Sequence, residues 1–338
     1  METLSDFALL RPRTIADVVA ARTHNPDARL LAGGTDLVVN MRRGILAPAV
    51  LIDIGAVAEL HELRADAAGL LIGAAVTLDA LAHDAGVSRN FAVVAQAAGS
   101  IAGPTHRAMG TLGGNLCLDT RCIFYNQSHW WRAANNHCLK TSGTVCHVAP
   151  KSRGVCFATF SGDLAPALMT LAAEVDVIGP MGQRTLPLKA LYRGFARHDA
   201  PAEGDGKHYL ALAPGEFVAR VRVRGEAGLR SGYDKMRIRR SIEFPVAGVA
   251  VALRRRGEAL DELRVAITGT NPRPVLLEGT QALTGGPLGP AVHAGLDRLV
   301  RDQVMAMKTT FTPGHYRRRV AGVLARRLLT RLFAEAPG

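Results

Sequence analysis

Apolar and polar positions alternate along this chain in short stretches, which predicts many short strands and helices rather than a few long ones. In the first sixty residues the pattern predicts helices at residues 14–22 and 37–43 and strands at residues 28–32 and 50–54. Thr14 and Asp17 have the spacing of a capping box at the start of the first helix, and Gly44 is suited to end the second. The chain therefore begins with a small α/β unit.

The same mixed pattern continues to the end of the chain. Between residues 58 and 224 it predicts helices at 78–83, 91–101 and 164–173, strands at 70–75, 175–178 and 184–188, and a strand pair within 210–223. After residue 225 it predicts strands at 232–239, 244–254 and 263–269, then helices at 275–283, 291–307 and 315–334. Strands followed by helices indicate an α+β module. We expect two domains, residues 1–222 with subdomains at about 1–57 and 58–222, and residues 225–335.

Two glycine-rich loops lie between expected elements of the first domain. Gly33, Gly34 and Thr35 form the first, after a strand and before a helix, and the segment GPTHRAMGTLGGNL at residues 103–116 contains the second. Residues without Cβ let a phosphate approach the backbone N–H groups, so two such loops suit a long phosphate-bearing ligand. Each loop taken singly is equally compatible with an ordinary turn. The GxGxxG pattern of dinucleotide-binding folds is absent from the first loop.

All five cysteines fall within forty residues, in a polar segment at residues 117–160 that cannot build a core of its own. A loop of that length in a compact domain is functional or held by something. Four of its thiolates can hold an iron–sulfur cluster or a zinc ion, or form two disulfides. Their successive spacings of 16, 8 and 10 positions match none of the usual short metal motifs, so spacing favours a cluster but leaves the other two open. The four are Cys122, Cys138, Cys146 and Cys156.

Composition narrows the possible functions. The formal net charge is +12, but the longest basic runs are triplets at residues 254–256 and 317–319, and aromatic residues make up only 5%. This pattern favours a solvated basic surface over nucleic-acid binding. The first residues lack the features of a secretory signal, and no apolar run reaches the ~18 residues of a membrane helix. We therefore expect a cytoplasmic protein, where thiols stay reduced, which weakens the disulfide interpretation.

Several motifs in order along the chain resemble one family. They are LLAGGTDLVVNMRRG at residues 30–44, TLGGNL at 111–116, SGDLAPAL at 161–168, GYDKMRIRRSIEFPVAGVAVAL at 232–253, and the segments AITGTNPRPV and HYRRRVAGVLARRLL further on. Together they resemble the FAD-binding middle subunit of the molybdenum hydroxylase (xanthine oxidase) family. The resemblance implies an α+β fold, with a two-subdomain FAD-binding domain of the vanillyl-alcohol-oxidase/PCMH type followed by a smaller C-terminal domain of the CO-dehydrogenase flavoprotein type.

The cysteine segment resembles one branch of that family. In most members the second glycine loop runs into the Asp-bearing segment after about a dozen residues, whereas here Asn115 and Asp163 are 48 positions apart. An inserted four-cysteine loop resembles the β subunits of 4-hydroxybenzoyl-CoA reductases. This resemblance implies FAD and a [4Fe-4S] cluster, with electrons passing from ferredoxin through both groups to [2Fe-2S] and molybdenum centres on partner subunits. An oxidative molybdenum hydroxylase with a zinc-binding loop is the alternative.

The resemblance also implies roles for individual residues. The first loop would wrap the FAD pyrophosphate with the backbone of Leu30, Leu31, Ala32, Gly33, Gly34, Thr35, Asp36 and Leu37. The second would hold its other phosphate through Thr111, Gly113, Gly114 and Asn115. Around the flavin ring it places Ile101, Leu212, Asp163, which otherwise serves as a helix N-cap, and Lys235, whose cation favours reduced anionic flavin.

The same resemblance makes Cys122, Cys138, Cys146 and Cys156 the cluster ligands. Cys117 is interpreted as a small packed hydrophobe, and His129, His137 and His147 as surface histidines rather than ligand substitutes. Glu243 stands where the family often has Asp. The implied partners are a molybdopterin-binding large subunit and a [2Fe-2S] small subunit, in a dimer of heterotrimers.

Overall fold

The structure, a computed structural model, describes residues 4–195, 204–239 and 242–335. Its first unit is the predicted small α/β arrangement, a parallel sheet in the order β1-β3-β2. The elements are β1 (Ala8–Leu10), α1 (Ile15–His24), β2 (Arg29–Leu31), α2 (Leu37–Arg42) and β3 (Val50–Asp53). The capping box is confirmed, because the side chains of Thr14 and Asp17 each accept a backbone N–H of the other. Gly44, with a φ of +59°, follows the end of α2 as expected.

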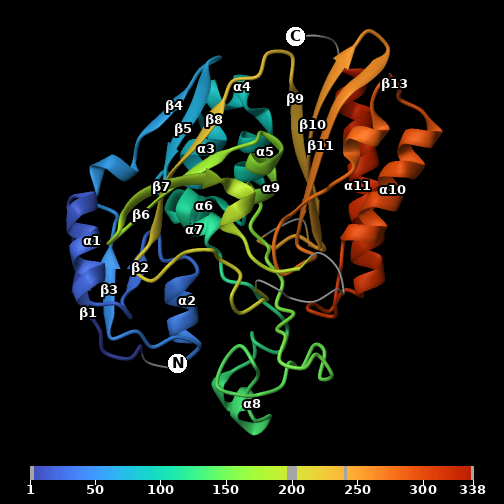
Figure 1. Cartoon of the computed structure of the whole chain (residues 1–338). Helices are drawn as coiled ribbons and strands as arrows, with labels where there is room; N and C mark the ends of the chain where they lie inside the picture. The colour runs from blue at the N-terminus through green and yellow to red at the C-terminus, as the bar shows by residue number, and fades with distance from the viewer. Residues whose placement is uncertain (1–3, 196–203, 240–241, 336–338) are drawn as a thin grey trace.

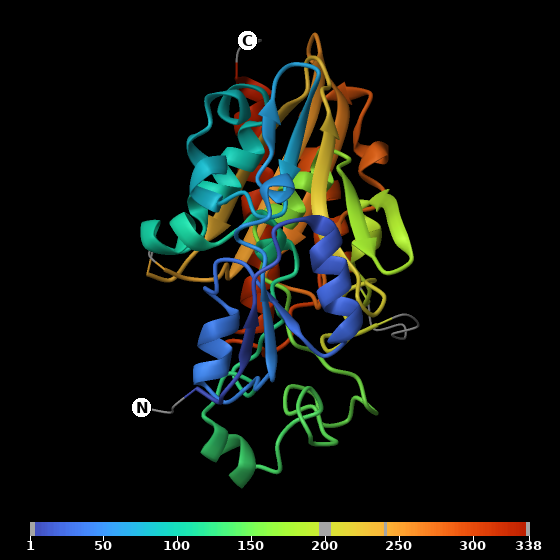
Figure 2. The ribbon, with the colours of Figure 1, turned by 90° about the vertical axis from the view of Figure 1, so that its left-hand side faces the viewer.

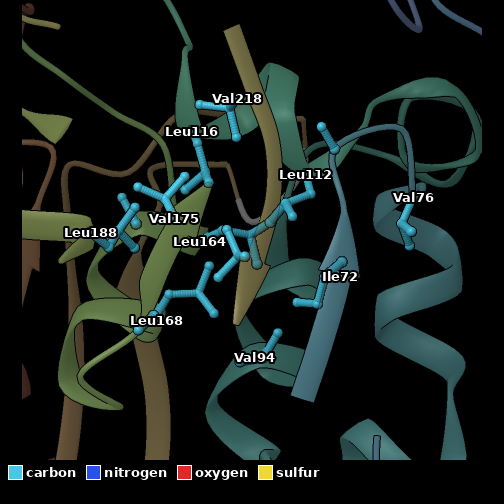
Figure 3. Close-up of a cluster of buried hydrophobic side chains, with 14 of the residues drawn as sticks. Ile72, Val76, Val94, Leu112, Leu116, Leu164, Leu168, Val175, Leu188 and Val218 are labelled. Carbon is cyan, nitrogen blue, oxygen red and sulfur yellow. The ribbon is translucent and has the colours of Figure 1, made fainter. Parts of the chain in front are cut away.

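The second unit is an antiparallel five-stranded sheet in the order β4-β5-β8-β6-β7. Its strands are β4 (Leu63–Ala65), β5 (Gly69–Gly73), β6 (Glu174–Gly179), β7 (Gly182–Pro187) and β8 (Phe217–Arg224). Its helices are α3 (Leu78–His83), α4 (Ala85–Asn90), α5 (Ala92–Ser100), α6 (Pro104–Met109), α7 (Leu112–Leu116), α9 (Leu164–Thr170) and the 3₁₀ turns η1 (Ala58–Leu60) and η2 (Leu188–Leu191). Figure 3 shows Leu164 and Leu168 of α9 among apolar side chains from this sheet and from α5 and α7.

The C-terminal unit is a second antiparallel sheet in the order β12-β11-β10-β9, with β13 also pairing with β11. It consists of β9 (Arg230–Met236), β10 (Ala247–Arg256), β11 (Ala259–Thr268), β12 (Val275–Leu276), η3 (Thr280–Leu283), β13 (Gly286–Pro287), α10 (Pro290–Gln303) and α11 (Gly314–Ala334). The long basic helix predicted at the C-terminal end is therefore present, and Figure 1 shows α10 and α11 beside this sheet.

Both faces of the C-terminal sheet are buried, which explains the nearly continuous apolar run in β10. Val249 and Val251 belong to the apolar cluster formed with α10 and α11, whereas Ala250 and Ala266 belong to the main core that contains α9. Side chains alternate between the two faces of a strand, so large residues face the C-terminal helices and small ones face α9. The small alanines allow α9 to approach closely.

Two expected elements differ from the structure. The helix predicted at residues 275–283 is wrong: Val275 and Leu276 pair with β11, and Gly279, with a φ of +83°, separates them from the short turn η3. Pairing with a buried strand overrides the helical spacing of this segment. The predicted strand pair within residues 210–223 is also wrong, because only β8 forms and Leu210 makes a single bridge with Tyr192. The domain and subdomain boundaries stay predictions.

The cysteine loop, residues 117–160, leaves the body of the protein and returns at one neck. Arg121 and Thr159 bond to each other through both backbone groups, at 2.9 and 2.8 Å, which closes the loop at its base. Its one helix in the described structure is α8 (His129–Ala134). Figures 1 and 2 show this loop projecting at the lower end of the molecule, below the first unit. None of the helices in the described ranges is long and apolar enough to cross a membrane.

The buried Arg317 of α11 generates a prediction about stability. Its guanidinium donates to the carbonyls of Val246 and Met307, each at 3.1 Å, and to that of Gly269. Arg317→Met should lower the free energy of unfolding by about 3 kcal/mol or more, because these buried acceptors lose their donor. Urea unfolding measures the change, and Arg318→Met, at the exposed neighbouring position, is the control, with an expected change within about 0.5 kcal/mol. Equal effects would contradict this assignment.

Candidate functional site

The two glycine loops are in direct backbone contact. A Cβ added to Gly33 would lie 1.7 Å from the carbonyl oxygen of Met109, so only glycine fits there. A Cβ at Gly110 would lie 3.4 Å from the Thr35 hydroxyl. Gly34 has a φ of +69°, which glycine adopts without strain. Segments more than seventy positions apart in the chain thus form one surface.

The first loop leaves a row of backbone donors free. Within the described ranges, the N–H groups of residues 33–37 have no protein acceptor. Leu30 and Leu31, by contrast, lie in β2 and pair with Ile52 and Asp53, and Ala32 follows them. These loop residues are partly exposed. Successive unpaired N–H groups form a concave donor surface suited to an anion, so the residues present fit a phosphate group.

The second loop is arranged differently, because its backbone donors are already engaged. Leu112 donates to Val76 O at 2.9 Å, Gly113 to Ala74 O at 2.8 Å, and Gly114 to the Thr111 hydroxyl at 3.2 Å. The glycines here allow α7 to pack against the strand end, since a Cβ at Gly113 would lie 2.9 Å from that of Ala74. These contacts pack the loop against the second sheet, and within the described ranges the Thr111 hydroxyl donates to no protein acceptor.

Asn115 links the second loop to the buried Asp163. Its side-chain oxygen accepts the N–H of Leu164 at 3.0 Å and so caps α9. Asp163 stands at the N-cap position of α9, but its side chain makes no capping hydrogen bond. Sequence reasoning offered a cap as its ordinary role; the structure assigns that role to Asn115 instead.

The Asp163 carboxylate is bound by two side chains of β9. Lys235 Nζ donates to both of its oxygens at 3.1 Å, and the Tyr233 hydroxyl donates to Oδ1 at 2.5 Å. Tyr233 and Lys235 are two positions apart on a strand and therefore point to the same face. Burial lowers the pKa of Lys235 against the opposing effect of Asp163, and burial raises the pKa of Tyr233. This buried group joins α9 of the main core to the C-terminal sheet.

Ile101 and Leu212 are the other two residues predicted to lie at the flavin ring. Ile101 ends α5, packs on the main core, and its carbonyl accepts from Arg107 Nη1 at 3.0 Å. Leu212 also packs on this core, but its neighbour Ala211 bonds to Leu191 and Arg184 rather than to the glycine loops. Contacts lead from Gly33 through Gly110, Asn115 and Asp163 to Lys235, and Leu212 meets this part of the molecule through the apolar core.

The four predicted cysteine ligands are all buried, with exposed fractions between 4 and 8%. All are free thiols, so the disulfide interpretation does not describe this structure. The Cys146 and Cys156 side chains share a hydrogen bond, and Cys122 interacts electrostatically with both Cys138 and Cys146. The loop thus gathers these four sulfurs into one region. In the described ranges, however, no three His, Cys, Asp or Glu side chains are grouped so that they could hold a metal ion.

Backbone N–H groups converge on these sulfurs. Cys146 accepts from Val148, Ala149 and Phe157, and Tyr125 N lies 3.3 Å from Cys122 Sγ. The hydrogen bond from Cys156 lowers the pKa of Cys146 to about 6, whereas it raises that of Cys156.

The remaining cysteine and the histidines of the loop make other contacts. Burial raises the pKa of Cys117, outside the group, to about 12, which suits its interpretation as a packed hydrophobe. His147 bonds to the carbonyl of His137 at 2.6 Å, and the rings of His129 and His137 lie 6.0 Å apart.

Sequence reasoning missed three residues of this region. Tyr233 is visible only by its spacing of two from Lys235, and nothing in the sequence pairs Arg121 with Asp36, whose atoms lie 2.7 Å apart. Arg132 is 2% exposed and donates to backbone carbonyls, a role that no local pattern reveals.

Comparison with known proteins places this geometry in a class of FAD-binding folds. Residues 5–223 match the family of FAD binding domains in molybdopterin dehydrogenases, and residues 231–332 match the CO dehydrogenase flavoprotein C-terminal domain. The chain is 30% identical to the aldehyde oxidoreductase FAD-binding subunit of Escherichia coli K12, over 94% of this chain and 97% of that protein. It is 26% identical to the carbon monoxide dehydrogenase medium chain of Afipia carboxidovorans, over 98% of each.

A solved CO dehydrogenase from Oligotropha carboxidovorans superposes with a TM-score of 0.79, covering 99% of this chain and 100% of that one at 24% identity. The predicted α+β fold, an FAD-binding domain followed by a CO-dehydrogenase flavoprotein C-terminal domain, is confirmed. The chain belongs to the FAD-binding subunits of the molybdenum hydroxylase family.

The contact between the two glycine loops gives a test of the site. Gly33→Ala should reduce retention of FAD, because the added methyl group collides with the backbone at Met109 and moves the free N–H row. The overpacking should also lower stability by about 1–3 kcal/mol. Flavin released from the purified protein measures retention. The control is Gly289→Ala, where a Cβ meets nothing within 4 Å. Normal flavin content in Gly33→Ala would contradict the role of this loop.

Proposed function

We propose that this chain is the electron-transfer subunit of a molybdenum-dependent 4-hydroxybenzoyl-CoA reductase and carries both FAD and a [4Fe-4S] cluster. The observation that carries the proposal is the group of four buried thiols in a loop inserted between Asn115 and Asp163. Membership of the FAD-binding family indicates the flavin, and the inserted loop is the basis for proposing this particular function within the family. The predicted boundaries at residues 1–222 and 225–335 and a cytoplasmic location belong to the same proposal.

The first loop would hold the flavin diphosphate through the free N–H groups of residues 33–37. Thr111 would add its hydroxyl from the second loop, whose other residues fix the shape of the site. Lys235 and Asp163 would lie at the ring, where the cation favours negative charge on the cofactor. FAD, when bound, exchanges electrons both in pairs and singly, which suits a position between one-electron centres.

Three features of the cysteine loop bear on the group that its thiols would hold. Backbone N–H groups reach the sulfurs of Cys122 and Cys146, as expected where thiolate charge must be stabilised. No Asp or Glu occurs between Asp119 and Asp163, so hard oxygen ligands are lacking there. Tetrahedral zinc with bonds of ~2.3 Å requires its sulfurs to meet closely, whereas a four-iron cube spaces them more widely. In the described ranges no three ligand side chains are grouped so that they could hold one metal ion, and iron analysis decides between the cluster and zinc.

The remaining chemistry would lie on partner chains. Only Cys117 lies outside the proposed ligand set, and one cysteine is too few for a [2Fe-2S] site. We infer a small [2Fe-2S] subunit and a large molybdopterin subunit, in a dimer of heterotrimers. The relatives' names, medium chain and FAD-binding subunit, support assembly with other chains. Removing the ring hydroxyl as water consumes two electrons and two protons, so this chain's task is to supply electrons.

Turnover by the assembled complex tests the proposal. Complex supplied with a reduced low-potential donor and 4-hydroxybenzoyl-CoA should release benzoyl-CoA, and this chain should contain iron and acid-labile sulfide. Zinc in place of iron, together with activity only in the oxidative direction, would favour the alternative of an oxidative hydroxylase subunit with a structural zinc loop.

The ligand set gives a second prediction. Cys138→Ser should remove most of the ~4 iron atoms per chain, because one thiolate of four is lost from a buried site. Iron and sulfide analysis and the visible absorption of the loop-bound group measure the loss. Cys117→Ser, at a thiol outside the set, should keep its iron. Unchanged iron in Cys138→Ser would show that the ligand set is wrong.

The charge of the loop gives a prediction about the electron donor, proposed to be a ferredoxin. Lys151 and Arg153 are exposed and no carboxylate lies nearby in sequence, so an acidic donor should be attracted. The double charge reversal Lys151→Glu, Arg153→Glu should slow electron entry from reduced ferredoxin roughly tenfold at low salt and reduce its salt dependence. Stopped-flow measurement of reduction rates checks this, with Arg319→Glu on α11 as the control. Equal slowing in the control would place the docking surface elsewhere.

A further inference from the structure

The cysteine loop holds both ends of helix α2. At the N-terminal end, Arg121 Nη2 donates to Asp36 Oδ1 at 2.7 Å. At the C-terminal end, Arg132 Nη2 donates to the carbonyls of Arg43 and Gly44 at 3.3 and 3.0 Å. Both arginines come from the loop, and α2 follows the first glycine loop without a break. The cysteine loop therefore contacts both ends of the helix that follows the free N–H groups of residues 33–37.

An apolar contact adds to the hydrogen bonds between the cysteine loop and α2. Ile45, just beyond α2, packs against the small buried cluster formed by Cys122, Tyr125 and Cys138. Two of the proposed ligands and the residue that follows α2 are therefore packed in the same apolar cluster. Any displacement of the loop displaces the C-terminal end of α2 with it.

Arg132 is bound in a way that fixes the position of its partners. Its side chain is buried, at 2% exposed, and its other nitrogen donates to the carbonyls of Tyr125 and Gln127 inside the loop. A buried guanidinium whose donors are met by backbone carbonyls cannot move without losing several hydrogen bonds. Helix α2 has only six residues, too few to be stable alone, so its orientation depends on such tertiary contacts.

We propose that Arg132 is a positioning residue for FAD: by holding the C-terminal end of α2 it orients the backbone donors of residues 33–37, so that flavin retention depends on the ordered cysteine loop. Arg121 supports the same helix at its other end. The inference rests on the proposed role of the first glycine loop in binding the flavin diphosphate. It assigns to the insert a second task, which is independent of electron transfer.

The test compares two buried cations of the same loop. Lys140 is the matched control: its side chain is 6% exposed, and it bonds to Asp119, Thr120 and the carbonyl of Gly206, none of them in α2. The dissociation constant of FAD is measured by flavin fluorescence on the assembled complex. Arg132→Met should raise this dissociation constant roughly tenfold or more, because a charge-assisted hydrogen bond is lost. Arg132→Lys, which keeps a donor, should restore part of the affinity, and Lys140→Met should raise the constant less than Arg132→Met.

The outcomes separate this inference from the proposed function. Weak FAD binding in Gly33→Ala together with normal binding in Arg132→Met would overturn the inference alone. Normal binding in Gly33→Ala would overturn the assignment of the loop itself. An equal increase in Arg132→Met and Lys140→Met would mean general loosening of the insert and would also overturn the inference. If Arg132→Met does not assemble, Arg121→Gln is the second variant, and unchanged FAD affinity there overturns the proposal.

Discussion

The buried contact of Asp163 with Lys235 and Tyr233 is the interaction on which the arrangement of the domains depends. An ion pair in a dry interior is costly unless each charge is fully paired and hydrogen-bonded. Here both carboxylate oxygens contact the ammonium group, and the phenol supplies a further donor. Because the two partners lie on α9 and β9, the contact fixes the C-terminal sheet against the FAD-binding domain. Its geometry is met only when both domains are correctly placed.

That constraint also explains the composition of the neighbouring elements. Every residue of α9 is buried, between the main sheet and the C-terminal sheet. Alanines at 250 and 266 leave room for the helix, while the valines beside them face the opposite layer. Gly248 serves the same end, since a Cβ there would lie 2.1 Å from the Tyr233 hydroxyl. Small residues thus surround the charged contact and allow it to form.

The cysteine loop depends on the same body in a different way. It has little apolar material, and its described interior consists of the sulfurs with a few neighbours such as Tyr125. Buried cations supply the missing order: Arg121, Arg132 and Lys140 each bond to parts of the chain outside or across the loop. The loop is therefore organised by hydrogen bonds to charged side chains, which tie it to the first glycine loop at its neck.

Local sequence determined much of this protein: the capping box at Thr14, the strand and helix around Gly33, the buried run of β10 and the grouping of the cysteines in one insert. These features depend on residues close together in the chain, where spacing, caps and glycine act directly. Tertiary structure alone decided that residues 275–276 pair as a strand, that Asn115 rather than Asp163 caps α9, and that Arg132 holds α2. The pairing of residues 275–276 depends on the neighbouring strand β11, and the other two depend on partners dozens of positions away. In each case a buried donor or acceptor takes whichever group the fold brings to it.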